Sequence, residues 1–526
     1  SEWTPPTVPQ VLPQQEKSAA DDTDSNQSKG VRGANLLFNN LTTDLNLRLV
    51  KNDAGEGFAV VENELLNLQG QEFKDFLCYQ FLKITGQPLR KEALGTVIMA
   101  LSAKAKYEGE LIQTPLRIAR VGNKFYLDLG RTKEGSKVIE ICPDKGDWRI
   151  LNESPILFRR GSWQKSIPTP VKGGDPWKFF DFCNVSESDR LLVLVAVITA
   201  LVPGISRPAL QLHGMQGSGK SFLAKMIKLL LDPTASIMLA LPPKEEDVLL
   251  SFYRHYIAPI DNITRLSTYL CAVVCSFISG GYIERRTLHT TMGVSTIPID
   301  CIPIFTSINS SIHERPDLTE RTIKIELQSI SKQQRMRESV LLENFQKAIP
   351  EILGSVLDVL VEAVRIYPRI ELKELPRMAD WGVWAYAVAE ALGGGHGEQF
   401  LKDYFDNIGM QTTDMLDDNS LLSAISARME SSGGLAGTFK EILNLLREDA
   451  EPALNDKSFP ASPRSLRRHL ERIRVPLSDL GIVYAIKGKT SRGRIIEFSK
   501  TGSAPAGTSN NEPEIAAPEG SGDLPF

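Results

Sequence analysis

The sequence has few of the features that mark an exported or membrane-bound protein. Its six cysteines are scattered without the spacing of a disulfide framework, no signal peptide is recognisable, and no run of about 18 apolar residues is free of charge. We therefore expect a cytoplasmic protein in a reducing compartment, with no membrane partner.

The chain also lacks a large excess of charge of either sign. Lys and Arg total 60 and Asp and Glu total 64, which gives a formal net charge of −4. Any surface for nucleic acid must therefore be local. Residues 32–167 contain no paired carboxylates suited to two metal ions, so nothing in them indicates polymerase or nuclease chemistry.

The stretch GMQGSGKS has the Gly-x-x-x-x-Gly-Lys-Ser pattern of a phosphate-binding loop. The apolar run PALQLHG before it and the helical pattern SFLAKMIKLLL after it place the loop between a buried strand and a helix. In such a loop backbone N–H groups surround the phosphates, the Lys reaches the β and γ oxygens, and the Ser hydroxyl faces Mg²⁺. The sequence predicts binding of ATP and Mg²⁺ by Gly214, Gln216, Gly217, Ser218, Gly219, Lys220 and Ser221.

A carboxylate for Mg²⁺ is expected at the end of a second strand, as in Walker B motifs. The run HYIAPIDNI supplies Asp261 about 40 residues after Lys220. Asn262 follows, where many ATPases place a glutamate that activates water. Since an amide can orient water but is a poor base, hydrolysis could be slow or could use a carboxylate from elsewhere.

The run IPIFTSIN predicts a third strand, and Ser307 and Asn309 compete for the role of the polar residue that senses the γ-phosphate. In multi-subunit ATPases an arginine is also offered to the neighbouring subunit's nucleotide. Arg321 is our candidate for this arginine finger and Arg315 is the second. The alternative is that both arginines only cap or pair on the surface.

Taken together, the phosphate loop, PIDN, SGGYIERRTLHT, RPDLTER and LPRMADWGVWAYAVAEALG resemble the AAA+ ATPase module of phage, plasmid and mobile-element replication proteins, which is related to superfamily 3 helicases. The resemblance covers residues 70–500. It implies a homo-oligomeric ring, typically a hexamer, with ATP between subunits and single-stranded DNA in the channel. A primase, as a partner or as an upstream domain absent from this chain, also fits the resemblance, since the chain begins at Ser1.

The segment between the second and third strands lies where such helicases carry a hairpin that projects into the channel. Arg285, Arg286 and His289 would there contact phosphates without regard to sequence. An ordinary solvent-facing hairpin is the alternative. In the helical lid, Arg377 is a candidate second sensor.

The C-terminal region is locally basic. Residues 461–500 hold ten Lys or Arg against three acids, a local charge of +7. Ser462 and Pro463 predict the start of a helix with an apolar face of Leu466, Leu470 and Ile473. Two strand-like runs joined by a basic loop follow it, which together with the helix is typical of a winged helix. The candidate DNA contacts are Arg464, Arg468, Arg472, Lys487, Lys489, Arg492 and Arg494.

The predicted fold class is therefore α/β, with an AAA+ type core and helical lid, an N-terminal α+β domain and a C-terminal winged helix. The expected boundaries are a tail (1–31), the α+β domain (32–167), the ATPase core and lid (168–395), a helical connector (396–455), the winged helix (456–500) and a second tail (501–526).

Cys271, Cys275, His289 and Cys301 can be imagined as zinc ligands, but their spacing matches no known zinc pattern, and small core residues are the favoured interpretation. The favoured function is an ATP-driven DNA translocase or helicase of a mobile-element replication system. Two alternatives stay open: an AAA+ assembly switch, such as a replication initiator, loader or phage-defence ATPase, and a scaffold that binds ATP without turnover.

Overall fold

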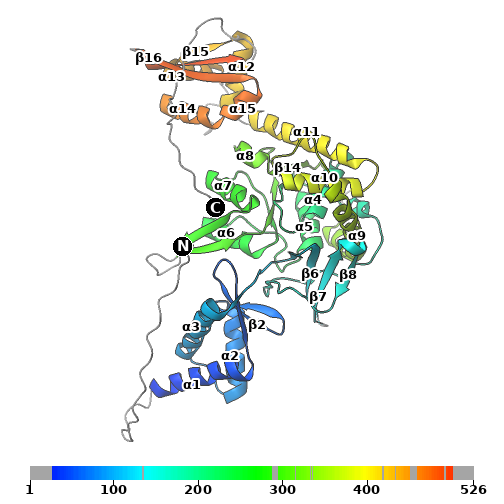
Figure 1. Cartoon of the computed structure of the whole chain (residues 1–526). Coiled ribbons are helices and arrows are strands. Elements are labelled where there is room, and N and C mark those ends of the chain that lie inside the picture. Colours follow the sequence, from blue (N-terminus) through cyan, green and yellow to red (C-terminus); the bar gives the residue numbers. More distant parts are fainter. Residues whose placement is uncertain are drawn as a thin grey trace, which may run out of the picture. The chain divides into compact units, whose positions relative to one another are not determined.

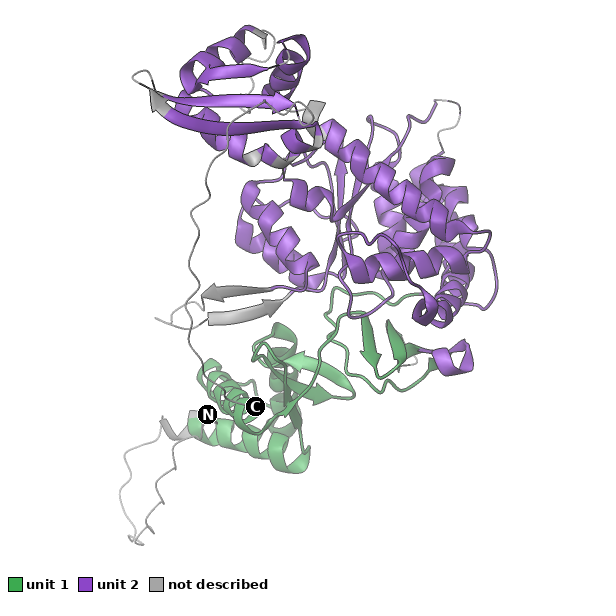
Figure 2. Ribbon diagram, turned by 45° about the horizontal axis from the view of Figure 1, so that its top comes forward, with its two compact units in different colours: residues 1–140, 149–167, 282–298 green, residues 141–148, 168–281, 299–526 purple. Residues whose placement is uncertain are grey.

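The protein is described here from a computed structural model. The described residues are 27–132, 135–286, 294–313, 315–331, 333, 336–417, 420–432, 434–449, 459–490 and 493–500. They form two compact units, coloured separately in Figure 2. The first unit holds residues 1–140, 149–167 and 282–298, and the second unit holds residues 141–148, 168–281 and 299–526.

The first unit begins with helices packed on a small sheet (Figure 1). Its helices are α1 (Gln27–Asn39), α2 (Gln71–Thr85) and α3 (Lys91–Glu108). Its sheet has the order β3-β2-β1-β4, with strands β1 (Arg48–Lys51), β2 (Gly57–Val61), β3 (Glu64–Asn67) and β4 (Glu110–Leu111). Phe73, Leu77 and Leu101 are buried in the shared core. The helix α1 begins at Gln27, inside the segment expected to be a tail.

A second sheet, of order β5-β6-β7-β8, follows. Its strands are β5 (Ile118–Val121), β6 (Lys124–Thr132), β7 (Gly135–Cys142) and β8 (Asp147–Leu151). The first unit also contains an antiparallel hairpin of β11 (Tyr282–Arg286) and β12 (Val294–Pro298). Residues 32–167 thus hold both helices and strands, as expected of an α+β domain, and the strands form two separate sheets. The division into units departs from the expected boundary, because residues 141–148 belong to the second unit.

The second unit contains a four-stranded parallel sheet of order β10-β13-β9-β14. The strands are β9 (Ala209–His213), β10 (Ile257–Ile260), β13 (Ile302–Ser307) and β14 (Thr322–Glu326). Nearly every residue in them is buried, as expected when helices cover both faces of a parallel sheet. The protein is therefore a mixed α/β protein with a parallel sheet.

Eight α-helices accompany this sheet in the described chain (Figure 1). They are α4 (Glu187–Thr199), α5 (Lys220–Leu231), α6 (Glu245–Arg254), α7 (Thr268–Ile278), α8 (Pro316–Thr319), α9 (Glu338–Ile366), α10 (Ala379–Ala391) and α11 (His396–Asp417). Helix α5 packs on β10 and β13, while α4 and α11 pack on β14. Trp381 and Trp384 are buried, in keeping with their expected role as core residues.

The boundary expected at residue 456 needs correction. One hydrophobic core joins Leu421 and Ile442 to Leu470 and Phe498, so the C-terminal domain begins near residue 420. Its elements are α12 (Ser420–Ser432), β15 (Leu435–Thr438), α13 (Phe439–Asp449), α14 (Pro463–Arg472), α15 (Arg474–Asp479), β16 (Ile482–Thr490) and β17 (Gly493–Lys500). The sheet order is β15-β17-β16. The rest of the expected connector is α11, which belongs to the parallel-sheet core.

No helix in the described ranges is long and apolar enough to span a membrane.

Candidate nucleotide site

The predicted phosphate loop connects the C-terminal end of β9 to the first residue of α5. Its shape depends on glycine, since Gly214, Gly217 and Gly219 have φ values of 145°, 80° and 92°. At Gly214 a Cβ atom would lie 2.2 Å from the carbonyl oxygen of Leu327. The loop can therefore pass this close to the backbone of Leu327 only with glycine at position 214.

Lys220 and Ser218 both carry polar atoms that bound phosphate could engage. The Lys220 Nζ donates hydrogen bonds to the carbonyl oxygens of Gly214 and Met215 at 2.7 and 2.9 Å, across the loop itself. Burial lowers the pKa of Lys220 from its ordinary value, and the charge of Asp261 partly offsets this. The Ser218 Oγ is fully buried and has no hydrogen-bond partner among the described residues. Gln216 is exposed at the loop surface.

Asp261 lies just past the end of β10 and accepts two hydrogen bonds from hydroxyl groups. The donors are Ser221 Oγ at 2.9 Å and Thr306 Oγ1 at 2.6 Å, both to Asp261 Oδ1. The Thr306 Oγ1 also accepts a hydrogen bond from the backbone N–H of Asn262 at 2.9 Å. Asn262 has a φ of 55°, which turns the chain away from the strand. Ser221 and Asp261, the two residues predicted to face Mg²⁺, are thus in direct contact.

Thr306 was missed by the sequence analysis, although it lies in the IPIFTSIN run beside one of the candidates. Strand β13 runs between β9 and β10, so its C-terminal end reaches the space between the phosphate loop and Asp261. On that strand Thr306 faces Asp261, whereas Ser307 is buried and donates to the Asn309 carbonyl at 2.8 Å. The Asn309 amide donates to the Thr264 carbonyl at 3.0 Å. Neither Ser307 nor Asn309 is bonded to the phosphate loop.

The residues fit a magnesium-bound nucleotide. A glycine loop with no room for a Cβ at Gly214, a Ser218 hydroxyl without a partner among the described residues and a lysine turned onto backbone oxygens are features that bound phosphate would use. Hydroxyl and carboxylate oxygens are also the donor set that Mg²⁺ prefers.

The three candidate arginines are bonded to residues outside this site. Arg321 precedes β14, and its carbonyl accepts from Ala209 N–H at the start of β9, whereas the phosphate loop follows the far end of β9. At about 3.3 Å per residue the five residues of β9 separate them by roughly 16 Å. The Arg321 guanidinium donates to the Asp317 carbonyl at 2.7 Å and to Ser279 Oγ at 3.1 Å. Arg315 pairs with Asp317 at 2.6 Å and Arg377 pairs with Glu320 at 2.6 Å.

The expected nucleic-acid contacts fall in two places. Arg285 and Arg286 lie at the C-terminal end of β11, where Arg286 is opposite Val294 on β12, while His289 is outside the described residues. In the C-terminal domain, Ser462 caps α14, whose apolar face is buried at Leu466 and Leu470. Arg464 and Arg468 on α14 and Arg494 on β17 are exposed, and Lys487 on β16 pairs with Glu497. Arg472 lies on α14 and Lys489 on β16, and Arg492 is outside the described residues.

The three cysteines considered as zinc ligands, Cys271, Cys275 and Cys301, are buried core residues. Cys271 and Cys275 are buried on α7, and burial raises the pKa of the two thiols to about 12 and about 11. Within the described residues no three His, Cys, Asp or Glu side chains gather as metal ligands.

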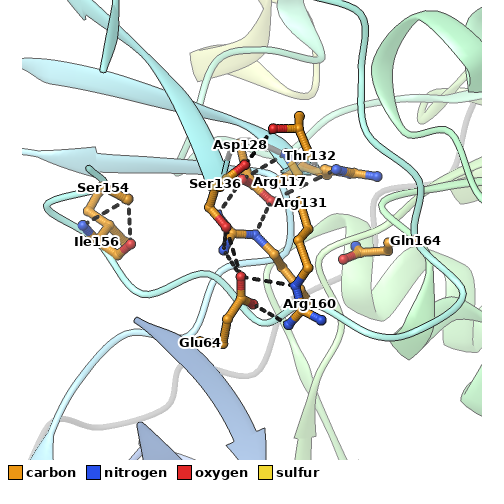
Figure 3. A network of polar contacts seen from close by, with 12 residues as sticks. Glu64, Arg117, Asp128, Arg131, Thr132, Ser136, Ser154, Ile156, Arg160 and Gln164 are labelled. Carbon is orange, nitrogen blue, oxygen red and sulfur yellow. Dashed lines mark hydrogen bonds and ion pairs between the residues drawn. The ribbon is translucent and has the colours of Figure 1, made fainter. Parts of the chain in front are cut away.

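The first unit contains a network of paired charges (Figure 3). Glu64, Ser136 and Arg160 of this network line a cavity of about 840 Å³. Arg160 bonds to Asp128 at 2.6 Å, to Glu64 at 2.7 Å and to Ser136 at 2.9 Å. Arg131 also contacts Glu64, at 3.1 Å. Since Arg160 holds residues of both sheets of this unit, the network ties them together.

The fold and this site define a mixed α/β protein whose parallel sheet carries a phosphate-loop sequence, followed by a separate C-terminal domain. Residues 178–404 match the family model described as "Actinomycete integrative conjugative element replication protein", and residues 421–512 match the "AICE RepA C-terminal domain". The two matches together span more than half of the chain. The chain therefore belongs to this family of mobile-element replication proteins, and the second match begins where α12 begins.

Likeness to other proteins is distant. No curated protein matches the chain. Two structures of the NrS-1 C terminal region are each 12% identical with a TM-score of 0.38, and cover 88% of this chain and 98% of theirs. A third, also at 12% and 0.38, covers 90% of this chain and 100% of its own. These values are too low for the likeness to bear on function.

Proposed function

We propose that this replication protein is an ATP-driven DNA translocase or helicase with an AAA+ type core, acting as a ring. The observation that carries the proposal is the contact of Ser221 with Asp261 beside a glycine-shaped loop, combined with an arginine at the opposite end of the same sheet. The contact of Ser221 with Asp261 suits the binding of ATP and Mg²⁺ within a subunit. The position of Arg321 suits an arginine that serves another subunit, because it cannot reach the nucleotide of its own subunit.

The roles of the residues follow from their contacts. Lys220 would exchange its two backbone carbonyl partners for phosphate oxygens, and Ser218 would gain a partner for its buried hydroxyl. Ser221 and Asp261 would hold Mg²⁺, which when bound neutralises charge on the phosphates. Thr306 orients the Asp261 carboxylate and connects it to the backbone of Asn262. Arg321 of a neighbour would stabilise negative charge in the transition state.

Two surfaces would contact DNA. Arg285 and Arg286 on the hairpin would grip the phosphates of a single strand, and the exposed arginines of α14 would contact a duplex. The winged-helix assignment of the C-terminal domain is supported by its helices followed by the long β16–β17 hairpin.

The test is steady-state ATP hydrolysis by the full chain with and without single-stranded DNA, with particle mass measured on the same samples. We expect DNA-stimulated turnover from a ring-sized particle. Lys220→Ala should abolish it, and Arg321→Ala should lower it by about 1,000-fold or more. Lys225→Ala on the same helix and Arg365→Ala on α9 are matched controls, since each loses an ion pair that lies outside the nucleotide site, with Glu338 and Glu362 respectively. The proposal would be contradicted by a monomeric particle whose ATP turnover is the same with and without DNA and is unchanged by Arg321→Ala.

Asn262 favours a second candidate, an assembly switch that binds DNA but does not unwind it. An amide at this position is a poor base, so ATP could drive ring formation with little turnover. A strand-displacement assay distinguishes the two functions. A helicase would separate the two strands of the substrate, whereas the switch would assemble when ATP is added and leave the duplex intact.

A further inference from the structure

Helix α11 packs on β14, the edge strand of the parallel sheet (Figure 1). Three residues on one face of α11 bond to alternate backbone positions of the chain. Tyr404 Oη donates to the Glu320 carbonyl at 3.2 Å, and Gln411 Nε2 donates to the Thr322 carbonyl at 2.8 Å. Asn407 accepts from the Lys324 N–H at 3.1 Å and donates to the Lys324 carbonyl at 2.6 Å.

This arrangement replaces a missing strand. β14 is an edge strand, and on its outer side the backbone groups of alternate residues would otherwise need another strand or water. The Asn407 amide satisfies both groups of Lys324, as a neighbouring peptide would. Asn407 and Gln411 are 2% and 6% exposed, so water does not substitute for them. A second link joins the two elements, because Lys324 Nζ pairs with Asp414.

The hydrogen bonds from α11 lie on both sides of Arg321 in the sequence. The carbonyl groups before and after Arg321, those of Glu320 and Thr322, are held by α11, whereas the Arg321 carbonyl itself bonds to Ala209 on β9. The backbone at this residue is thus fixed from both sides. An arginine that acts on a transition state needs this kind of prior positioning, since a misplacement of about 1 Å can cost about 100-fold in rate.

We propose that Tyr404, Asn407 and Gln411 are positioning residues that hold β14 so that Arg321 meets the ATP site of a neighbouring subunit. This inference rests on the proposed function, in which Arg321 acts between subunits. It adds that a helix far along the chain from the phosphate loop controls turnover in a site of another subunit.

The main variant is Gln411→Leu in the full chain, which leaves the Thr322 carbonyl without its partner. We expect kcat to fall by about tenfold and the KM for ATP to stay unchanged, because the variant's own nucleotide site is intact. Gln399→Leu is the matched control, since that glutamine lies on the same helix but bonds to Asp403 and, among the described residues, not to β14. Tyr404→Phe, a milder change, should cost about twofold to tenfold in kcat and serves if Gln411→Leu does not fold. Its control is Tyr386→Phe, which loses only a contact to Glu398.

Mixing of subunits distinguishes positioning from loss of structure. Lys220→Ala subunits have a dead site but an intact Arg321, so adding them to Gln411→Leu subunits should raise turnover severalfold above either alone. Arg321→Ala mixed with Lys220→Ala is the reference and should also recover. If the reference recovers and Gln411→Leu does not, or if Gln411→Leu and Tyr404→Phe keep full turnover, the positioning role is wrong and the proposed function stands. If the reference fails, the proposed function and this inference fall together.

Discussion

Two carboxylate clusters in this protein are built from similar residues but have different partners. In the first unit, Asp128 and Glu64 are paired with Arg160, and all three side chains are at most 10% exposed. In the second unit, the hydrogen bonds to the Asp261 carboxylate come from the hydroxyls of Ser221 and Thr306. Carboxylates already neutralised by arginine serve structure, whereas one held by hydroxyls is available to a cation.

The largest expected effect comes from breaking the paired cluster. Arg160→Met would remove the cation that bonds to both Asp128 and Glu64 and leave them only Arg117 and Arg131, which should destabilise the first unit by up to about 3 kcal/mol. Hydrogen exchange of the β6 amides in the full chain would measure this loss locally. Adding Glu64→Gln to Arg160→Met should recover part of the loss, since that buried carboxylate is then neutral while Asp128 keeps the buried Arg117 at 3.8 Å. Unchanged exchange in Arg160→Met would show that the network does not hold the unit together.

The next effect comes from the cluster without a cation. Asp261→Asn keeps an oxygen that can accept from Ser221 and Thr306, so stability should change by less than about 1 kcal/mol. ATP turnover should nevertheless fall by about 100- to 1,000-fold, because the negative charge for Mg²⁺ is gone. Thermal unfolding and a turnover assay on one preparation check both halves. If Asp261→Asn loses stability but keeps its ATP turnover, Asp261 serves the structure of the protein and not the binding of a cation.

The two clusters also differ in how far the sequence predicts them. The phosphate loop and Asp261 are predictable, because the chemistry requires fixed residue types at the ends of buried strands. Arg160 and Glu64 are 96 residues apart, and no local pattern relates them. The same limit explains the missed role of α11 and the misplaced start of the C-terminal domain. In both cases the sequence indicated a helix but could not indicate which core the helix joins.

Thr306 sharpens the comparison at a smaller scale. Thr306→Val keeps the shape of the side chain but removes the hydroxyl that orients Asp261 and accepts from Asn262 N–H. We expect kcat to fall by about tenfold. A tenfold change in rate corresponds to roughly 1.4 kcal/mol, which is what one hydrogen bond can contribute. Ser307→Ala is the control, since Ser307 bonds to Asn309 rather than to the Asp261 group. Equal losses in the two variants would mean that Thr306 has no special place in the site.

The smallest effect should come from pH, at a third carboxylate with paired cations. Burial raises the pKa of Glu140, but hydrogen bonds from Lys124, Arg149 and Tyr126 outweigh burial and lower it from 4.5 to about 2. A depressed pKa in the folded state stabilises the fold above the unfolded value, so this contribution is full above pH 4.5 and is lost as the pH falls toward 2. Because Lys124 and Arg149 are 35% and 56% exposed, water screens the pairs, and the loss should be only about 1 kcal/mol. Hydrogen exchange of the β7 amides at pH 6 and pH 3 should show a smaller difference in Glu140→Gln than in the unmodified chain. An equal difference in the variant and the unmodified chain would assign the acid sensitivity to other groups. Glu64 would be the first of these to test, because burial raises its pKa but Arg131 and Arg160 outweigh burial and lower it.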